Sequence, residues 1–159
     1  TKVAKVIAGG ETAQDSIYNC LMTGAAENPE DSIVLLHDGV RPFVSQRVLD
    51  GAYREAWNNG AVIPMIELQD SLRQIIGGEG ASQTVPRDRY RLVQTPQVFK
   101  LSVLRRAYEQ RFVESFTDDA SVVEAYGGHI TLVDGERTNI KITTPEDITL
   151  AESFLNILK

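Results

Sequence analysis

Short apolar runs alternate along the chain with longer segments in which apolar residues recur every three or four positions. The longer segments predict helices at residues 12–26, 45–57, 101–112, 117–126 and from Thr144-Pro145 to the C-terminus. The runs predict strands at residues 3–8, 32–36, 61–66, 90–93 and 130–133, and a short extended piece at 139–142. This alternation predicts a single α/β domain, residues 1–159, on a largely parallel sheet. Residues 32–36 are too apolar to have a face in water, as is typical of parallel strands.

Turn and capping residues support these boundaries. Ser45 is a predicted N-cap, and Asn58-Asn59-Gly60 is expected to end the helix that follows it. Thr144 is a second predicted N-cap, because Pro145 and two acidic residues follow it in the first helical turn.

One pair of extended segments falls outside the alternation of strands and helices. Residues 71–76 and 82–85 flank the glycine-rich turn Gly77-Gly78-Glu79-Gly80, which predicts a β-hairpin. Such a hairpin either decorates the domain or forms an arm, residues 69–87, that packs on another subunit.

Composition excludes several classes of protein. The 159 residues carry a formal charge of −6, which argues against non-specific binding to nucleic acid. The apolar runs are too short to span a membrane, and no signal-peptide pattern opens the chain, so we expect no membrane partner. The single cysteine, Cys20, permits no internal disulfide and favours a reducing compartment such as the cytoplasm. A phosphorylated small molecule remains compatible, because it needs only a local cluster of positive charge.

The loop after residues 32–36 carries candidate chemistry. Ligands of open α/β sheets bind beyond the carboxyl ends of strands, where this loop places Asp38 and Arg41. A carboxylate suits Mg²⁺, and a guanidinium suits phosphate oxygens. A structural Asp–Arg pair that shapes the turn explains the spacing equally well. His37, beside an apolar strand, is expected to be a structural residue.

Other polar residues follow predicted strands or begin helices. Gly10, Glu11 and Ser16 lie where a strand leads into a helix, which suits a flat ligand but also suits an ordinary turn. Thr95 either contacts a ligand or braces its turn, and Thr117-Asp118-Asp119 is first of all a helix cap. Lys141 either lies at a sheet edge in water or holds a phosphate, and Arg87 reads as a solvated charge. Asp, Arg, Lys and Thr at loop ends suit phosphate and polyol handling without a covalent intermediate.

These motifs occur together in the order and spacing of one family. The chain resembles the 2-C-methyl-D-erythritol 4-phosphate cytidylyltransferases of the non-mevalonate isoprenoid pathway. The resemblance implies a Rossmann-like, three-layer, mostly parallel sheet of the nucleotide-diphospho-sugar transferase type with a protruding hairpin arm. It rests on residues 9–16 and on the segments His37-Asp38-Gly39-Val40-Arg41-Pro42-Phe43, Gln94-Thr95-Pro96-Gln97-Val98-Phe99, Thr117-Asp118-Asp119-Ala120-Ser121 and Asn139-Ile140-Lys141-Ile142-Thr143-Thr144-Pro145-Glu146-Asp147.

The resemblance implies an enzyme that joins CTP and methylerythritol phosphate, with Mg²⁺, to give a CDP-alcohol and pyrophosphate. Asp38 is implied near the metal and the polyol, and Lys141 at the phosphates. The arm is implied to make a homodimer. The remaining implied roles are nucleotide contacts for Gly10, Glu11 and Ser16, polyol contacts for Arg41, Thr95 and Thr117, and contacts by Ser71, Arg87 and Thr95 with the substrate phosphate in a neighbour's site.

The chain departs from the family pattern at its start, because the glycine-rich loop that wraps the CTP triphosphate does not precede Thr1. We therefore expect the C-terminal part of the family's domain, with weak CTP binding and little turnover on its own. Three alternatives stay open at this stage. They are the sister enzyme that acts on ribitol 5-phosphate, a nucleotide-sugar transferase, and a non-catalytic dimerising remnant.

Overall fold

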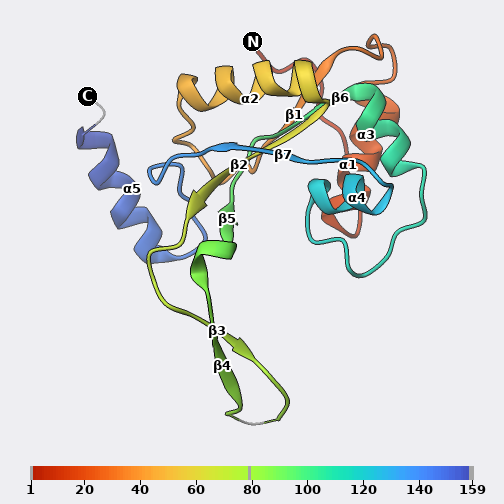
Figure 1. Cartoon of the computed structure of the whole chain (residues 1–159). Helices are drawn as coiled ribbons and strands as arrows, with labels where there is room; N and C mark the ends of the chain where they lie inside the picture. Colours follow the sequence, from red (N-terminus) through yellow and green to blue (C-terminus); the bar gives the residue numbers. More distant parts are fainter. Residues whose placement is uncertain (1, 79, 158–159) are drawn as a thin grey trace.

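A five-stranded sheet forms the centre of the molecule (Figure 1). The computed structural model describes residues 2–78 and 80–157. The sheet has the order β1-β6-β2-β5, and β7 pairs with the other edge of β2. Its strands are β1 (Ile33–Leu36), β2 (Ala61–Glu67), β5 (Arg91–Val93), β6 (Gln97–Lys100) and β7 (Thr131–Asp134).

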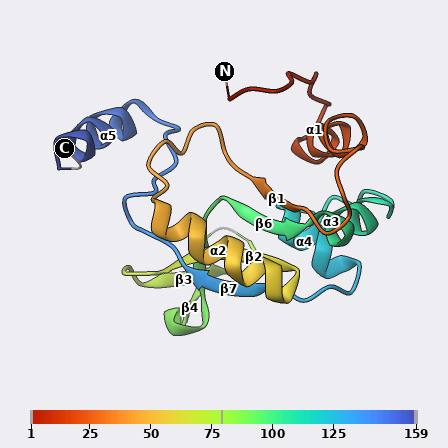
Figure 2. The same ribbon diagram turned by 90° about the horizontal axis from the view of Figure 1, so that it is seen from above.

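Helices cover both faces of this sheet (Figure 2). Neighbouring residues of β2 and β6 point to opposite faces, as the pleat of a strand requires. Ala61 and Phe99 pack with α3 and α4, whereas Val62 and Val98 pack against Ala52 and Ala56 of α2. The helices are α1 (Ala13–Asn19) continued by the π-helix η1 (Cys20–Gly24), α2 (Gln46–Asn59), α3 (Leu101–Tyr108), α4 (Asp119–Ala125), α5 (Pro145–Ile157) and the 3-10 helix η2 (Arg87–Arg89).

The helix boundaries predicted at Ser45, Gly60 and Pro145 agree with the structure, but the helix predicted over residues 101–112 ends at Tyr108. The Ser45 hydroxyl accepts a hydrogen bond from Val48 N, and Gly60 ends α2 with a positive φ of 90°. At the start of α5, the backbone amides of Thr143 and Thr144 donate to Asp147, which lowers the pKa of that carboxyl below its ordinary value. None of the helices in the described part of the chain is long and apolar enough to cross a membrane.

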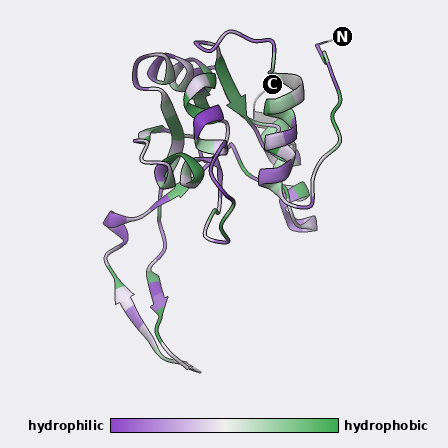
Figure 3. Cartoon of the chain, turned by 90° about the vertical axis from the view of Figure 1, so that its right-hand side faces the viewer, coloured by the Kyte–Doolittle hydropathy of each residue, from purple (hydrophilic) through white to green (hydrophobic). Residues whose placement is uncertain are grey.

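The predicted hairpin is present and projects away from the body (Figure 3). Among the described residues, strands β3 (Leu72–Ile75) and β4 (Ser82–Val85) pair only with each other. Arg73 stiffens the pair, because its guanidinium donates across to the hydroxyls of Ser82 and Thr84. Glu79 of the predicted turn, and residues 158 and 159 of the predicted last helix, lie outside the described residues.

The mixed α/β class is confirmed, but the described pairings are not mostly parallel. Only β2 and β7 pair in parallel, whereas β1–β6, β6–β2 and β2–β5 are antiparallel. The difference arises partly from β6, a strand that the sequence analysis did not predict, since it follows Pro96 directly and passes into α3 without a turn residue. The β6 strand lies between β1 and β2 and runs antiparallel to both, and β5 adds a third antiparallel pairing on β2.

Three further sequence predictions differ from the structure. Residues 3–8 form no strand; the described pairings give them no partner, and Val6 is 89% exposed. The β1 strand is not buried on both faces, because it pairs with β6 alone and Leu35 is 40% exposed. Residues 139–142 form no strand either, although Ile142 N donates to Val40 O at 2.9 Å.

Because Phe99 on β6 is fully buried, Phe99→Ala should lower the free energy of unfolding by about 3–5 kcal/mol. Urea denaturation followed by circular dichroism measures the loss. Phe112→Ala removes the same side chain from a site that is 46% exposed and should cost much less. Equal losses for the two variants would contradict the placement of β6 at the centre of the core.

Candidate functional site

The loop after β1 gathers two cations around one carboxylate. Arg41 Nε lies 3.1 Å from Asp38 Oδ2, and Lys141 Nζ lies 3.3 Å from the same oxygen. The backbone closes the turn, since Arg41 N donates to Asp38 O at 3.0 Å. The Asp–Arg pair therefore shapes its turn, and it also faces Lys141, which comes from a distant segment.

Arg41 is held more firmly than Lys141. Its side chain is only 12% exposed, and its Nη1 donates to the carbonyl of Asn139 at 2.7 Å. The Lys141 side chain is 48% exposed, and Asp38 is the only described partner of its ammonium. Arg41 is thus a fixed part of the site wall, whereas Lys141 can turn toward an anion in the cavity.

Thr95 reaches the site because two residues loop out between β5 and β6. Met65 pairs with Val93 and Val62 pairs with Val98, so three steps along β2 correspond to five along the opposite chain. Asp38 N donates to Thr95 Oγ1 at 3.0 Å, so Thr95 belongs to the same chain's site as Asp38. The implied contact of Thr95 with a neighbour's site stays a prediction.

His37 lies between Thr95 and Arg41. Its Nδ1 is 3.0 Å from Thr95 Oγ1, and its Nε2 is 2.8 Å from Arg41 O. One ring nitrogen thus bonds within the loop after β1 and the other bonds the loop after β5, as a structural residue would.

Two buried amides tie the loops together. Asn139 is fully buried, and its Nδ2 donates to Thr95 O at 2.8 Å. Gln94 donates to the carbonyls of Glu136 and Asn139 and accepts from Glu136 N. The loop after β5 is thereby fixed to the chain that leads from β7 to Lys141. Neither amide was a sequence-based candidate, because each contacts residues far away in the chain.

The first turn of α4 is fixed by a third buried amide. Gln97 Nε2 donates to Asp118 Oδ2 at 2.8 Å, and Gln97 Oε1 accepts from Ala120 N at 2.9 Å. Asp118 is the N-cap and forms a capping box with Ser121, as predicted for this segment. Thr117 precedes the cap, and its hydroxyl has no hydrogen bond within the described part of the chain.

Asp119 does not share the capping role that the sequence suggested for its segment. Tyr108 on α3 donates its hydroxyl hydrogen to Asp119 Oδ1. Burial raises the pKa of the Asp119 carboxyl above its ordinary value of 3.8, although the Tyr108 hydrogen bond partly opposes the shift. Burial, together with the charge of Asp119, raises the pKa of Tyr108. Sequence offered no signal for this pair, because its members come from different helices.

Asp38, Arg41 and Lys141 line one cavity of about 560 Å³. Gln94, Gln97, Asp118 and Asp119 line it too. The cavity contains positive charge from Arg41 and Lys141 and negative charge from three aspartates, so it can receive an anion beside a polar, hydroxyl-rich group. Six of the sequence-predicted site residues line it: Ser16, Asp38, Arg41, Thr95, Thr117 and Lys141.

Gly10 and Glu11 lie beside the cavity lining rather than in it. Gly10 N donates to Ser16 Oγ at 3.0 Å, and a Cβ on Gly10 would overlap the Asp15 side chain. Thr12 and Asp15 form a capping box that begins α1. Glu11 is exposed and makes no side-chain hydrogen bond within the described residues.

Ser71 and Arg87 lie at the base of the arm and do not line this cavity. Arg87 Nη1 donates to the carbonyl of Gln69 and thereby braces that base. Within one chain, the structure therefore does not bring these two residues together with Asp38.

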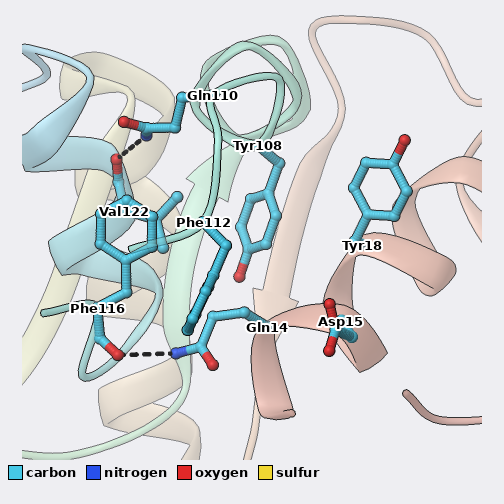
Figure 4. Close-up of a pocket in the computed structure, with 8 residues that line it drawn as sticks. All are labelled: Gln14, Asp15, Tyr18, Tyr108, Gln110, Phe112, Phe116 and Val122. Atoms are coloured by element: carbon cyan, nitrogen blue, oxygen red, sulfur yellow. Dashed lines mark hydrogen bonds between the residues drawn. The ribbon is translucent and has the colours of Figure 1, made fainter. Parts of the chain in front are cut away.

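A smaller cavity of about 230 Å³ lies between α1 and the α3–α4 pair (Figure 4). Tyr108, Phe112 and Phe116 form its apolar wall opposite Tyr18, and Gln14 crosses from α1 to donate to Phe116 O at 3.2 Å. Gln14 and Asp15 line it together with Tyr18, so α1 borders both cavities. Because the phenol of Tyr108 also bonds Asp119, this wall supports the α4 end of the larger cavity.

Comparison with known proteins identifies relatives along almost the whole chain. A family model described as 2-C-methyl-D-erythritol 4-phosphate cytidylyltransferase matches residues 1–157. The chain is 49% identical over 147 residues to the protein of that name from Phocaeicola vulgatus and 50% identical to that from Bacteroides fragilis. Each alignment covers 92% of this chain and 64% of the relative, so the chain spans about 64% of the length of these two proteins.

Solved structures show the same fold. The Thermus thermophilus 2-C-methyl-D-erythritol 4-phosphate cytidylyltransferase matches with a TM-score of 0.80 and 38% identity over 92% of this chain and 70% of that one. The Francisella tularensis protein of the same name matches with a TM-score of 0.84 and 30% identity, over 96% of this chain and 73% of that one.

Asp119→Asn tests the burial of the carboxylate beside the cavity. Since the folded protein holds this acid at a raised pKa, it binds more protons than the unfolded chain above pH 3.8, and stability falls as pH rises through the folded pKa. Asparagine can still accept from Tyr108 and carries no charge. The variant should therefore gain unfolding free energy relative to the parent as pH rises from about 4 to 7, as followed by urea denaturation. A constant difference across that range would contradict the assignment.

Proposed function

The chain belongs to the 2-C-methyl-D-erythritol 4-phosphate cytidylyltransferase family, and from this premise we propose that it provides the polyol-phosphate site and part of the CTP site of such an enzyme. The reaction joins CTP and methylerythritol phosphate to give the CDP-alcohol and pyrophosphate, a step of isoprenoid precursor synthesis. The observation that carries the proposal is the placement of Lys141 and Arg41 on Asp38, in one cavity with Thr95 and Thr117.

The proposed reaction needs charge neutralisation rather than a general base. A phosphate oxygen of the polyol phosphate attacks the α-phosphorus of CTP, a new P–O bond forms, and the bond to the β-phosphate breaks as pyrophosphate leaves. The attacking phosphate is already ionised near neutral pH. Cationic side chains can bring the two anions together and stabilise the charge that develops on the α-phosphate.

Lys141 is the proposed phosphate clamp. Its ammonium is exposed enough to leave Asp38 for an incoming phosphate, whereas Arg41 is fixed by Asn139 and defines where the substrate lies. Asp38 keeps both cations in place before the anions arrive.

A divalent cation, Mg²⁺, is part of the proposal. Across residues 2–78 and 80–157, no group of three His, Cys, Asp or Glu side chains gathers to hold a metal. Mg²⁺ commonly takes one or two carboxylates and completes its shell with water and substrate phosphates, so Asp38 alone fits such an ion. Mg²⁺ bound there with CTP would neutralise part of the negative charge on the phosphates.

Gly10, Glu11 and Ser16 are the proposed contacts for the cytosine and ribose. Ser16 lines the same cavity as Asp38, and the turn at Gly10 bonds directly to Ser16, which supports a nucleotide beside the phosphate clamp. One cysteine in 159 residues supports a reducing location such as the cytoplasm.

A homodimer is proposed to complete the site through the arm. Strands β3 and β4 project from the body (Figure 1), and Ser71 and Arg87 at their base do not line their own chain's cavity. A neighbouring chain's cavity supplies the phosphate that a hydroxyl and a guanidinium would bind.

Release of pyrophosphate from CTP and Mg²⁺ tests the function, with methylerythritol phosphate and ribitol 5-phosphate offered in parallel and UTP as the nucleotide control. The assay uses the chain itself and a chimera that adds the remaining residues of the Phocaeicola vulgatus relative, because the chain spans 64% of that protein. We expect release with CTP and methylerythritol phosphate. Release with ribitol 5-phosphate or UTP instead would reassign the substrate, and release by neither protein would refute catalysis.

In the same assay, Lys141→Ala should reduce turnover about a hundredfold or more, as expected for a lost transition-state charge. Lys100→Ala is the matched control, because Lys100 lies on β6 and does not line the cavity. Similar losses in the two variants would show that Lys141 has no special role.

Mixing two inactive variants tests whether the arm acts across subunits. Asp38→Asn disables the site of its own chain, and Arg87→Ala disables the arm. In mixed dimers, one site combines an intact Asp38 with an intact Arg87, so a one-to-one mixture that exchanges subunits should regain about a quarter of parental activity. If dimers shown to have exchanged subunits regain no activity, Arg87 does not act on the neighbouring chain's site.

A further inference from the structure

His37 makes two hydrogen bonds whose directions can be assigned. The Arg41 carbonyl oxygen can only accept, so His37 Nε2, at 2.8 Å, must carry a hydrogen. In a neutral imidazole the other nitrogen, Nδ1, then has a bare lone pair. The Thr95 hydroxyl lies 3.0 Å from Nδ1 and supplies the hydrogen for that bond.

The Thr95 hydroxyl is left with one free lone pair. A threonine oxygen has one hydrogen to donate and two lone pairs that accept. His37 takes the hydrogen, and the backbone N–H of Asp38 occupies one lone pair at 3.0 Å. Thr95 lines the cavity beside Asp38, so only an acceptor remains for a ligand there.

An ionised phosphate oxygen is itself an acceptor and has no hydrogen to share, whereas a hydroxyl of a polyol can donate. We infer that His37 is a positioning residue that fixes Thr95 as an acceptor, so that Thr95 selects a substrate hydroxyl and not the substrate phosphate. This inference rests on the proposed function for the identity of the ligand, but the direction of the His37–Thr95 bond stands independently.

Thr117 provides the contrast within the same cavity. Its hydroxyl has no partner among the described residues, so it keeps its hydrogen and can donate to a phosphate or accept from a hydroxyl. The two threonines would thus read the ligand differently, although the sequence offers the same side chain at both positions.

Long-range ¹H–¹⁵N correlation spectra of the protein with ¹⁵N-labelled histidine test the bond direction without any substrate. His37 should show a protonated Nε2 and a bare Nδ1 near neutral pH. The chain has two histidines, and the exposed His129 provides the internal reference for an averaged ring. A hydrogen on Nδ1 of His37 would overturn the inference. Thr95→Val should shift the His37 Nδ1 resonance and leave His129 unchanged.

A matched pair of variants tests the consequence for substrate binding. The Asn side-chain oxygen lies as many bonds from Cα as His Nδ1, so His37→Asn can keep the acceptor toward Thr95. The Gln side-chain nitrogen corresponds in the same way to Nε2, so His37→Gln can keep the donor toward Arg41 but frees the Thr95 hydroxyl. If His37 acts through Thr95, the KM for the polyol phosphate should rise up to about tenfold in His37→Gln, less in His37→Asn, with the KM for CTP unchanged.

The opposite order, with His37→Asn the more impaired, would show that the bond to Arg41 matters instead and would overturn the inference. A lower kcat together with higher KM values for both substrates, in both variants, would indicate a general structural role and would also overturn the inference. The failure of the proposed function is distinguishable, because an inactive protein with a bare His37 Nδ1 would refute the substrate while the bond direction held. An active protein with a hydrogen on Nδ1 would do the reverse.

Discussion

The change of register along β2 is the constraint on which the site depends. Because two residues leave the ladder between β5 and β6, Thr95 stands outside the sheet while Gln94 and Gln97 on either side remain buried. Those two amides then bond the β7–Lys141 segment and the first turn of α4. A continuous ladder here would place Thr95 in the sheet and leave both neighbouring loops without their anchors.

The electrostatic design of the cavity follows from that framework. Asp38 faces two cations of unequal freedom, one held by a buried backbone carbonyl and the other half in water. One carboxylate oxygen of Asp38 contacts both Arg41 and Lys141, so it holds the two cations near the place where two phosphates would meet. Its negative charge also reduces the repulsion between the two cations until an anion binds. The proposed chemistry thus needs no activated nucleophile.

Local signals in the sequence predicted much of this architecture. Caps at Ser45 and Asp118 and the glycine-rich hairpin were readable because their physics is contained within a few neighbouring residues. The strand β6 was missed because it lacks a turn before its helix, and β6 and β5 together make most of the described pairings antiparallel. Most predicted site residues share one cavity, whereas the buried amides and Tyr108–Asp119 were not predictable, since their partners lie in distant segments.

The amide framework has a consequence for how the site responds to its medium. Gln94, Gln97 and Asn139 are uncharged and buried, so dissolved ions do not screen the bonds by which they hold the loops, whereas the ammonium of Lys141 lies half in water and feels the full ionic atmosphere. Rising ionic strength should therefore weaken the attraction of the cavity for anions while its shape persists. The molecule separates the part that recognises charge from the part that keeps geometry.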